Sequence, residues 1–178
     1  MSTSLETRRL YFRELQPSDD KAMFELDANP NVHRYLGNKP VTSIEESRAM
    51  IQNIRQQYID NGIGRMAAIL KDTNEFIGWV GLKLQENVNG RDCYYDIGYR
   101  LIERHWGKGY ATEANLFFRD YAFNHLNVPL LNATALTANK ASCHILEKTG
   151  LKFTETFDYN GEECRWFEML NPNLKHTQ

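Results

Sequence analysis

Seven segments of the chain carry the apolar patterns that are typical of β-strands, and turn-forming residues bound them. Asn-Gly pairs at 89–90 and 160–161 separate neighbouring segments, and this dipeptide is the strongest short-range signal for a tight hairpin. The pattern therefore predicts strands with hairpins at both pairs, over residues 10–15, 66–70, 76–84, 93–102, 130–136, 153–159 and 163–170.

Helical spacing of apolar residues occurs in four other segments. In one of them Ser43 and Glu46 form a capping box at the start, and Gly62 supplies the stop. In another, Asn139 is a capping residue and Gly150 ends the helix. We predict helices after residues 17–20, between residues 43 and 62, from the segment at 107–112 to residue 125, and between residues 139 and 150.

The order of the predicted elements is strand, two helices, three antiparallel strands, helix, strand, helix and two strands. Such an order indicates an α/β fold with a mixed, mostly antiparallel sheet and helices on its faces. A chain of 178 residues suits one domain. We therefore expect a single domain over residues 1–178, with its core at about 8–170 and a tail at 171–178.

Composition and charge exclude several function classes. A net charge of −2 provides no general attraction to nucleic acid or acidic membranes. No apolar run approaches the ~20 residues that cross a bilayer, and the first residues lack the apolar core of a signal peptide. Three cysteines without CxxC spacing favour a reducing, cytoplasmic setting. The five histidines show no ligand spacing, so we expect no metal.

The most informative segment joins the strand that ends near Ile102 to a helix through Gly107 and Gly109. A helix N-terminus has unpaired N–H groups and a partial positive charge, and glycines let an anion approach the backbone. A dinucleotide-binding loop would need a third glycine where Thr112 stands, and the loop of nucleoside triphosphatases would need GxxxxGK followed by Ser or Thr. Both patterns are absent, so the segment predicts a different phosphate ligand.

Residues 106–114, with Gly107, Gly109 and Ala111, resemble motif A of the GCN5-related N-acetyltransferases (GNAT). Residues 139–153 resemble the second cofactor segment of that family, and the resemblance covers essentially the whole chain. Residues 5–13 and 31–36 are similar to the branch that contains ribosomal-protein N-terminal acetyltransferases of the RimJ/RimL type. The resemblance implies a GNAT fold of about seven strands and about four helices, whose sheet splays at an acetyl-CoA cleft.

The resemblance also implies which residues hold acetyl-CoA, the acyl donor. Backbone groups of Leu101 and Ile102 would pair with the pantetheine amides, and Asn139 would bond the pantetheine arm. The pyrophosphate would be surrounded by backbone N–H groups, with Lys108 adding charge. Trp106 stands where the family has Gln or Arg, so backbone N–H groups would contribute more of the pyrophosphate binding. The N–H groups concerned are those of Gly107, Lys108, Gly109, Tyr110, Ala111 and Thr112.

The resemblance implies direct attack of an amine on the thioester, which requires a base and an acid. Asp96 is the first candidate for the base, Asp158 on the last hairpin the second, and Glu163 the third. The family tyrosine that protonates the leaving thiolate is Leu146 here, so Ser142 is the natural substitute. Asp96 and Ser142 each have a structural alternative, Asp96 as a hydrogen-bonding residue of a strand and Ser142 as a residue of a first helical turn.

Three functions remain open from the sequence. The first is acetylation of a protein or peptide α-amine. The second is acetylation of a small amine, such as a polyamine, an amino acid or an antibiotic. The third is a regulator that binds acyl-CoA without catalysis. The expected partners are acetyl-CoA and an amine acceptor. We expect the protein itself to be a monomer or a homodimer.

Overall fold

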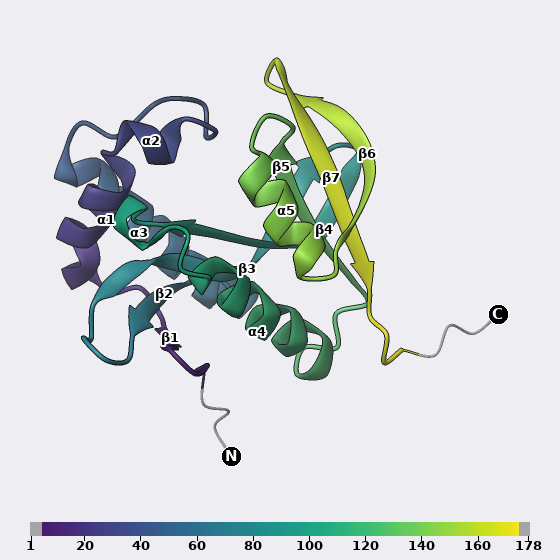
Figure 1. Ribbon diagram of the computed structural model, residues 1–178, viewed down its shortest axis with the longest axis horizontal. Coiled ribbons are helices and arrows are strands. Elements are labelled where there is room, and N and C mark those ends of the chain that lie inside the picture. Colours follow the sequence, from purple (N-terminus) through teal and green to yellow (C-terminus); the bar gives the residue numbers. More distant parts are fainter. Residues whose placement is uncertain (1–4, 175–178) are drawn as a thin grey trace.

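The computed structural model describes residues 5–174, which form one seven-stranded sheet and five α-helices (Figure 1). The strands are β1 (Leu10–Arg13), β2 (Arg65–Leu70), β3 (Phe76–Val88), β4 (Arg91–Leu101), β5 (Leu130–Leu136), β6 (Lys152–Tyr159) and β7 (Glu162–Leu170). The helices are α1 (Asp20–Asp27), α2 (Pro30–His33), α3 (Ile44–Asn61), α4 (Tyr110–Asn124) and α5 (Lys140–Lys148), with 3₁₀ turns at Pro17–Asp19 and Glu103–His105. The α/β class and the order of elements are confirmed; α2 is the one α-helix that was not predicted.

The local signals of the sequence act as expected. Both residues of the Asn-Gly pairs 89–90 and 160–161 have positive φ, as a two-residue hairpin turn of this type requires. Ser43 and Glu46 form the capping box of α3. Gly62 ends that helix in the left-handed conformation, with φ of 69°. These signals set the ends of α3 and the two hairpins from neighbouring residues alone.

Helices cover both faces of the sheet, and the core therefore has two parts. Along β2, Ala67 and Ile69 face one cluster and Ala68 faces the other, and all three are buried. α1 and α3 pack over the first cluster. α4 and α5 pack over the second, with α4 against β3 and β4 and α5 against β5 (Figure 1). A continuous apolar stretch in β2 follows from this double cover.

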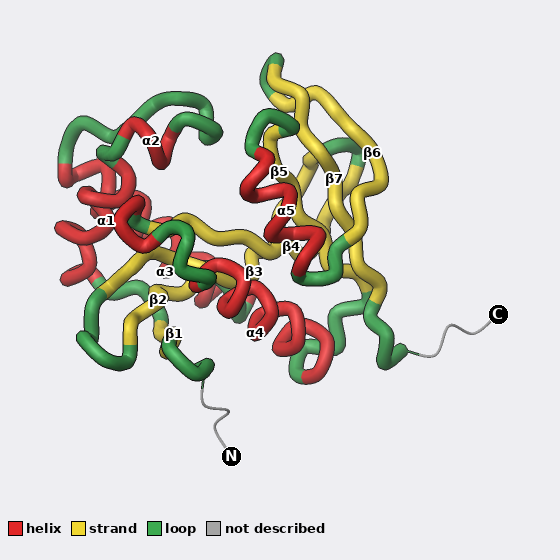
Figure 2. The backbone as a smooth tube through the Cα atoms, viewed as in Figure 1, coloured by secondary structure: helices red, strands yellow, loops and turns green. Residues whose placement is uncertain are grey.

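The strand order is β1-β2-β3-β4-β5-β7-β6, with β7 placed between β5 and β6. Only the contact between β4 and β5 is parallel, and it consists of two residue pairs, Tyr95 with Leu131 and Asp96 with Asn132. Beyond these pairs the two strands continue without a ladder. The sheet therefore has two halves, β1 to β4 and β5 to β7, whose strands are the yellow segments in Figure 2.

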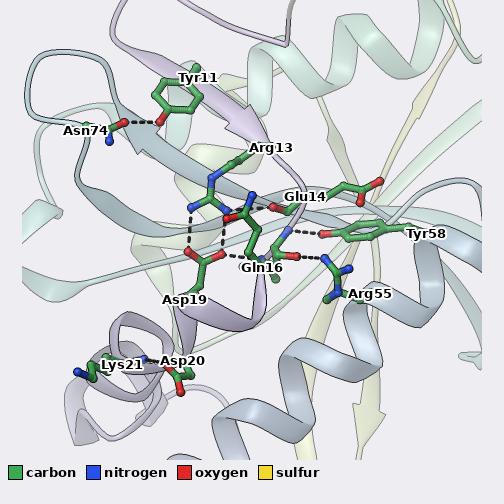
Figure 3. Close-up of polar contacts among 11 residues, drawn as sticks. Tyr11, Arg13, Glu14, Gln16, Asp19, Asp20, Lys21, Arg55, Tyr58 and Asn74 are labelled. Atoms are coloured by element: carbon green, nitrogen blue, oxygen red, sulfur yellow. Dashed lines mark hydrogen bonds and ion pairs between the residues drawn. The ribbon is translucent and has the colours of Figure 1, made fainter.

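A group of polar contacts fixes the chain where it leaves β1 (Figure 3). Arg13 makes two bonds to the Asp19 carboxylate, each 2.8 Å long. The Tyr58 hydroxyl on α3 accepts from the Leu15 N–H at 3.1 Å, and Arg55 Nη1 donates to the Leu15 carbonyl at 2.6 Å. These bonds satisfy both backbone groups of Leu15 and hold the N-terminal segment against α3.

A close approach of two strands generates a stability prediction at Gly78. Its φ is 141°, and an added Cβ would lie 2.1 Å from the Arg100 carbonyl oxygen on β4. We expect Gly78→Ala to lower the free energy of unfolding by more than about 2 kcal/mol in urea titrations. Gly90→Ala is the control, because its φ is 71° and nothing lies within 4 Å; we expect a loss of about 1 kcal/mol. Equal losses would contradict the steric argument.

Candidate active site

The loop before α4 presents a row of free backbone donors. Gly107 and Gly109 have φ of 70° and 80°, and Gly109 is the N-cap of α4. The N–H groups of residues 107–112 donate to no group among residues 5–174. Gly107, Lys108 and Gly109 are exposed, so these donors are accessible from outside. The loop therefore has the free donors and helix terminus that favour an anion.

The separation of β4 from β5 leaves backbone groups of β4 without a strand partner. The Ile102 N–H donates to the Ile77 carbonyl at 2.9 Å, so it is directed toward β3 and not toward β5. Backbone groups alternate along a strand, and those of Leu101 accordingly point to the other side. The Leu101 carbonyl accepts from the Trp106 indole at 2.8 Å, while its N–H stays available for an incoming strand-like ligand. Trp106 thus braces the loop against the end of β4.

The start of α5 lies on the other side of this separation. Asn139 is the predicted N-cap, and its Oδ1 accepts from the Ser142 N–H at 3.1 Å. The Ser142 side chain lies near the phenol of Tyr99 on β4. Burial raises the pKa of Tyr99, and the neighbouring Ser142 side chain opposes part of the rise. The hydroxyl groups of these two residues therefore lie near each other in the region where β4 and β5 part.

Asp96 occupies the point at which the two strands separate, because it belongs to the last residue pair between β4 and β5. Its Oδ2 forms an ion pair with Nη2 of Arg65 on β2, and its side chain is 14% exposed. Its Oδ1 has no hydrogen-bond partner among the described residues. Burial raises the pKa of Asp96, whereas the charges of Arg65 and Lys83 act in the opposite direction.

Asp96 also lines a cavity of about 150 Å³ between the two halves of the sheet. Aromatic rings and polar side chains both line the cavity, and Trp166 lies fully buried against two of the rings. The lining residues are Gln85, Val88, Tyr94, Asp96, Thr134, Phe157, Tyr159 and Cys164. A single carboxylate in an aromatic cavity is a suitable environment for one small amine.

The hairpin carboxylates do not share this cavity. Asp158 Oδ1 accepts from the Gly161 N–H at 3.1 Å within the β6–β7 turn, and Asp158 is exposed. Its neighbours Phe157 and Tyr159 line the cavity, and side chains alternate along a strand. Glu163, which is paired with Asp158, lines a separate hollow beside Lys140. The structure therefore brings Asp96 to the cavity and places the other two candidates elsewhere.

Two residues of the site were missed by sequence reasoning. Arg65 pairs with Asp96 across 31 residues, and Tyr99 contacts Ser142 across the cleft. One signal was present for Arg65, since it is the only charged residue in the otherwise apolar stretch of β2. A lone charge at a buried position requires a partner. No comparable signal distinguished Tyr99 from the other aromatic residues of β4.

Comparison with known proteins decides the family. The family model for the GNAT acetyltransferase domain matches residues 9–152. An uncharacterized N-acetyltransferase, p20 of Bacillus licheniformis, is 34% identical over 143 residues, which are 80% of this chain and 79% of the relative. The chain belongs to the GNAT acetyltransferase family. It is therefore an acyltransferase whose acyl donor is acetyl-CoA.

Solved structures agree with the fold and differ in their acceptors. A spermidine N-acetyltransferase from Vibrio cholerae, solved with CoA and spermine, has a TM-score of 0.74 and 22% identity, with 93% of this chain and 97% of that chain covered. A ribosomal-protein-S5-alanine acetyltransferase from Vibrio fischeri has a TM-score of 0.76 and 16% identity, with 97% and 98% covered. The predicted RimJ/RimL branch is thus one of several kinds of structural neighbour.

Three further observations concern metal ions, membrane-spanning helices and cysteines. Residues 5–174 contain no cluster of His, Cys, Asp or Glu that would hold a metal ion. Over the same residues, no helix is long and apolar enough to span a membrane. The cysteines Cys93, Cys143 and Cys164 are all free thiols.

The loop generates a prediction about donor binding. Gly109→Val would add a branched side chain to the loop, and its Cβ would lie 3.3 Å from Arg9 Nη2. We expect calorimetry to show acetyl-CoA affinity reduced by more than about tenfold, or 1.4 kcal/mol. Gly62→Val, at the end of α3, is the control for backbone strain, because its φ is 69° with nothing within 4 Å. Wild-type affinity in Gly109→Val would contradict the assignment of the loop.

Proposed function

We propose that this enzyme transfers the acetyl group of acetyl-CoA to the α-amine of a protein or peptide, by direct attack of the amine on the thioester. The position of Asp96 is the observation that carries the proposal. Asp96 lies where β4 and β5 part, and it lines the aromatic cavity. Its Oδ1 has no hydrogen-bond partner among the described residues. An acceptor in the cavity would meet a donor in the cleft at this point.

In this proposal the donor uses three features of the site. The N–H groups of residues 107–112 surround the pyrophosphate, and the Lys108 ammonium adds positive charge. The Leu101 N–H pairs with pantetheine along the free side of β4, and Asn139 contacts it from α5. A donor held in this way directs its thioester toward Asp96, since the separation between the strands narrows in that direction.

The proposed base is Asp96, acting directly or through one water. A base must be ionised to accept a proton, and burial brings the pKa of Asp96 above its ordinary value, which makes it a stronger base than an exposed aspartate. The Arg65 ion pair holds Oδ2 and leaves Oδ1 for the amine. The tetrahedral oxyanion would be stabilised by a backbone N–H of the unpaired part of β4.

The charges near Asp96 favour an acceptor with a single amine. Lys83 lies directly opposite Asp96 in the β3–β4 ladder, and Arg65 is bonded to it, so two cations accompany one carboxylate. A polycation would meet repulsion there. An α-amine has a pKa of about 7.7–8.0 against about 10.4 for lysine, so it costs roughly 3 kcal/mol less to deprotonate. One modest base is sufficient for such an acceptor.

A small-molecule amine is the second candidate. The observation in its favour is the size of the cavity, about 150 Å³, which suits a compact amine as well as a single N-terminal residue. The two candidates use the same donor site and the same base, and they differ in whether the acceptor continues out of the cavity as a peptide.

A competition assay tests the acceptor. We expect a peptide with a free α-amine to be acetylated faster than the same peptide blocked there but carrying lysine, and faster than spermidine. The kcat/KM for this peptide should rise with pH through the α-amine pKa of about 7.7–8.0 and level off above it, because only the neutral amine attacks. It should fall at low pH as Asp96 becomes protonated, at a pH above the ordinary aspartate range. Faster acetylation of either competitor would overturn the α-amine proposal and leave the family activity intact.

Ser142 is proposed to protonate the leaving thiolate. The hydroxyl matters most as charge develops on sulfur, so Ser142→Ala should lower kcat by at least about tenfold while the dissociation constant of acetyl-CoA changes by less than about threefold. Ser142→Thr retains a hydroxyl at the same helical position and should recover most of kcat. Undiminished turnover in Ser142→Ala would show that this serine is only a residue of the first helical turn.

A further inference from the structure

The segment that precedes β1 contacts the first turn of α4 beside the glycine loop. Thr7 Oγ1 and the Arg9 backbone N–H both donate to Glu113 Oε1, at 2.6 and 2.9 Å. Arg9 Nε donates to Glu113 Oε2 at 2.6 Å. Both oxygens of the Glu113 carboxylate are therefore occupied by a segment about a hundred residues away in the sequence.

The Arg9 guanidinium extends from this ion pair onto the loop itself. Its Nη1 donates to the Lys108 carbonyl at 2.8 Å, and its central carbon lies 4.4 Å from the centre of the Tyr110 ring. Its Nη2 lies 3.3 Å from the position of a Cβ on Gly109 and donates to no group among residues 5–174. The guanidinium thus contacts Lys108 and Tyr110, on either side of Gly109, and keeps one nitrogen free at the loop.

We infer that Arg9 completes the pyrophosphate-binding site: it holds the loop through the Lys108 carbonyl and offers Nη2 to a phosphate oxygen of acetyl-CoA. The inference rests on the proposed donor site. A guanidinium presents its donors in a fixed plane, so anchoring Nε and Nη1 to the protein also orients Nη2. Charge-assisted bonds of this kind are among the stronger ones for phosphate groups.

Charge balance gives a second reason for the same role. Glu113 lies in the first turn of α4, where a carboxylate interacts favourably with the helix dipole. The same carboxylate repels the pyrophosphate that the loop would bind. The ion pair with Arg9 cancels this charge, and both side chains are largely shielded, with exposures of 36% and 19%. Loss of Arg9 would remove a phosphate ligand and also leave Glu113 uncompensated beside the anion.

Binding of three ligands distinguishes a phosphate-binding role of Arg9 from a general stabilising role. CoA and 3′-dephospho-CoA both contain the pyrophosphate, whereas pantetheine lacks it. Calorimetric titration of Arg9→Ala should show affinity lowered by at least about tenfold for both nucleotides and by less than about twofold for pantetheine. Arg9→Lys keeps the positive charge without the planar set of guanidinium donors. It should lower the affinity for the two nucleotides by less than Arg9→Ala does, again with little effect on pantetheine. Arg8→Ala is the matched control, because the adjacent Arg8 is exposed, and it should bind all three ligands as the wild type does.

Each alternative result has a distinct meaning. An equal loss for pantetheine in both Arg9 variants would show that Arg9 only stabilises the fold. A loss for CoA but not for 3′-dephospho-CoA would assign Arg9 to the 3′-phosphate and overturn the inference. Unchanged affinity in Arg9→Ala would also overturn it and would leave the proposed donor site standing. A wild-type protein that binds neither nucleotide would instead refute the donor site.

Discussion

The end of pairing between β4 and β5 after Asp96 is the constraint on which the other features of the site depend. A parallel ladder that continued would satisfy the backbone of β4 and leave no entry for a donor. Because the ladder stops after two residue pairs, the Leu101 N–H stays available and Asp96 lies at the boundary between paired and unpaired strand. The helices α4 and α5 then lie on opposite sides of the separation, each with its N-terminal end contributing to the site.

Electrostatics distinguish the proposed donor side from the proposed acceptor side. On the donor side, free N–H groups, a helix terminus and the Arg9 guanidinium are arranged around a position suited to an anion. On the proposed acceptor side, Asp96 is the one carboxylate that lines the aromatic cavity, and burial raises its pKa against the opposing charge of Arg65. The two environments meet at the end of the short ladder, where bond formation requires a bound thioester and a neutral amine.

Features that depend on neighbouring residues could be predicted from the sequence. The hairpins at 89–90 and 160–161, the capping box at Ser43 and the cap at Asn139 are examples, because the responsible groups lie within a few residues of one another. The helix α2 was missed because four residues are too few to show a helical period. The ion pair of Arg65 with Asp96 was missed because it depends on strand register, which is set by the whole sheet. Asp158 was predicted as a candidate base from its place on the hairpin. The sequence did not show that the Gly161 N–H would donate to one of its oxygens within the turn.

The insertion of β7 between β5 and β6 has a consequence for the timing of folding. During synthesis, β5 is made well before β7, and its side opposite β4 stays an unpaired edge until Glu162–Leu170 has been added. The lining of the aromatic cavity includes Cys164 from this strand and Phe157 and Tyr159 from β6. This part of the cavity is therefore among the last parts of the domain to form. A nascent chain that has reached α5 already carries the complete glycine loop. Translation therefore completes the proposed donor side before the proposed acceptor side, and the proposed active site is complete only after the final hairpin closes the sheet.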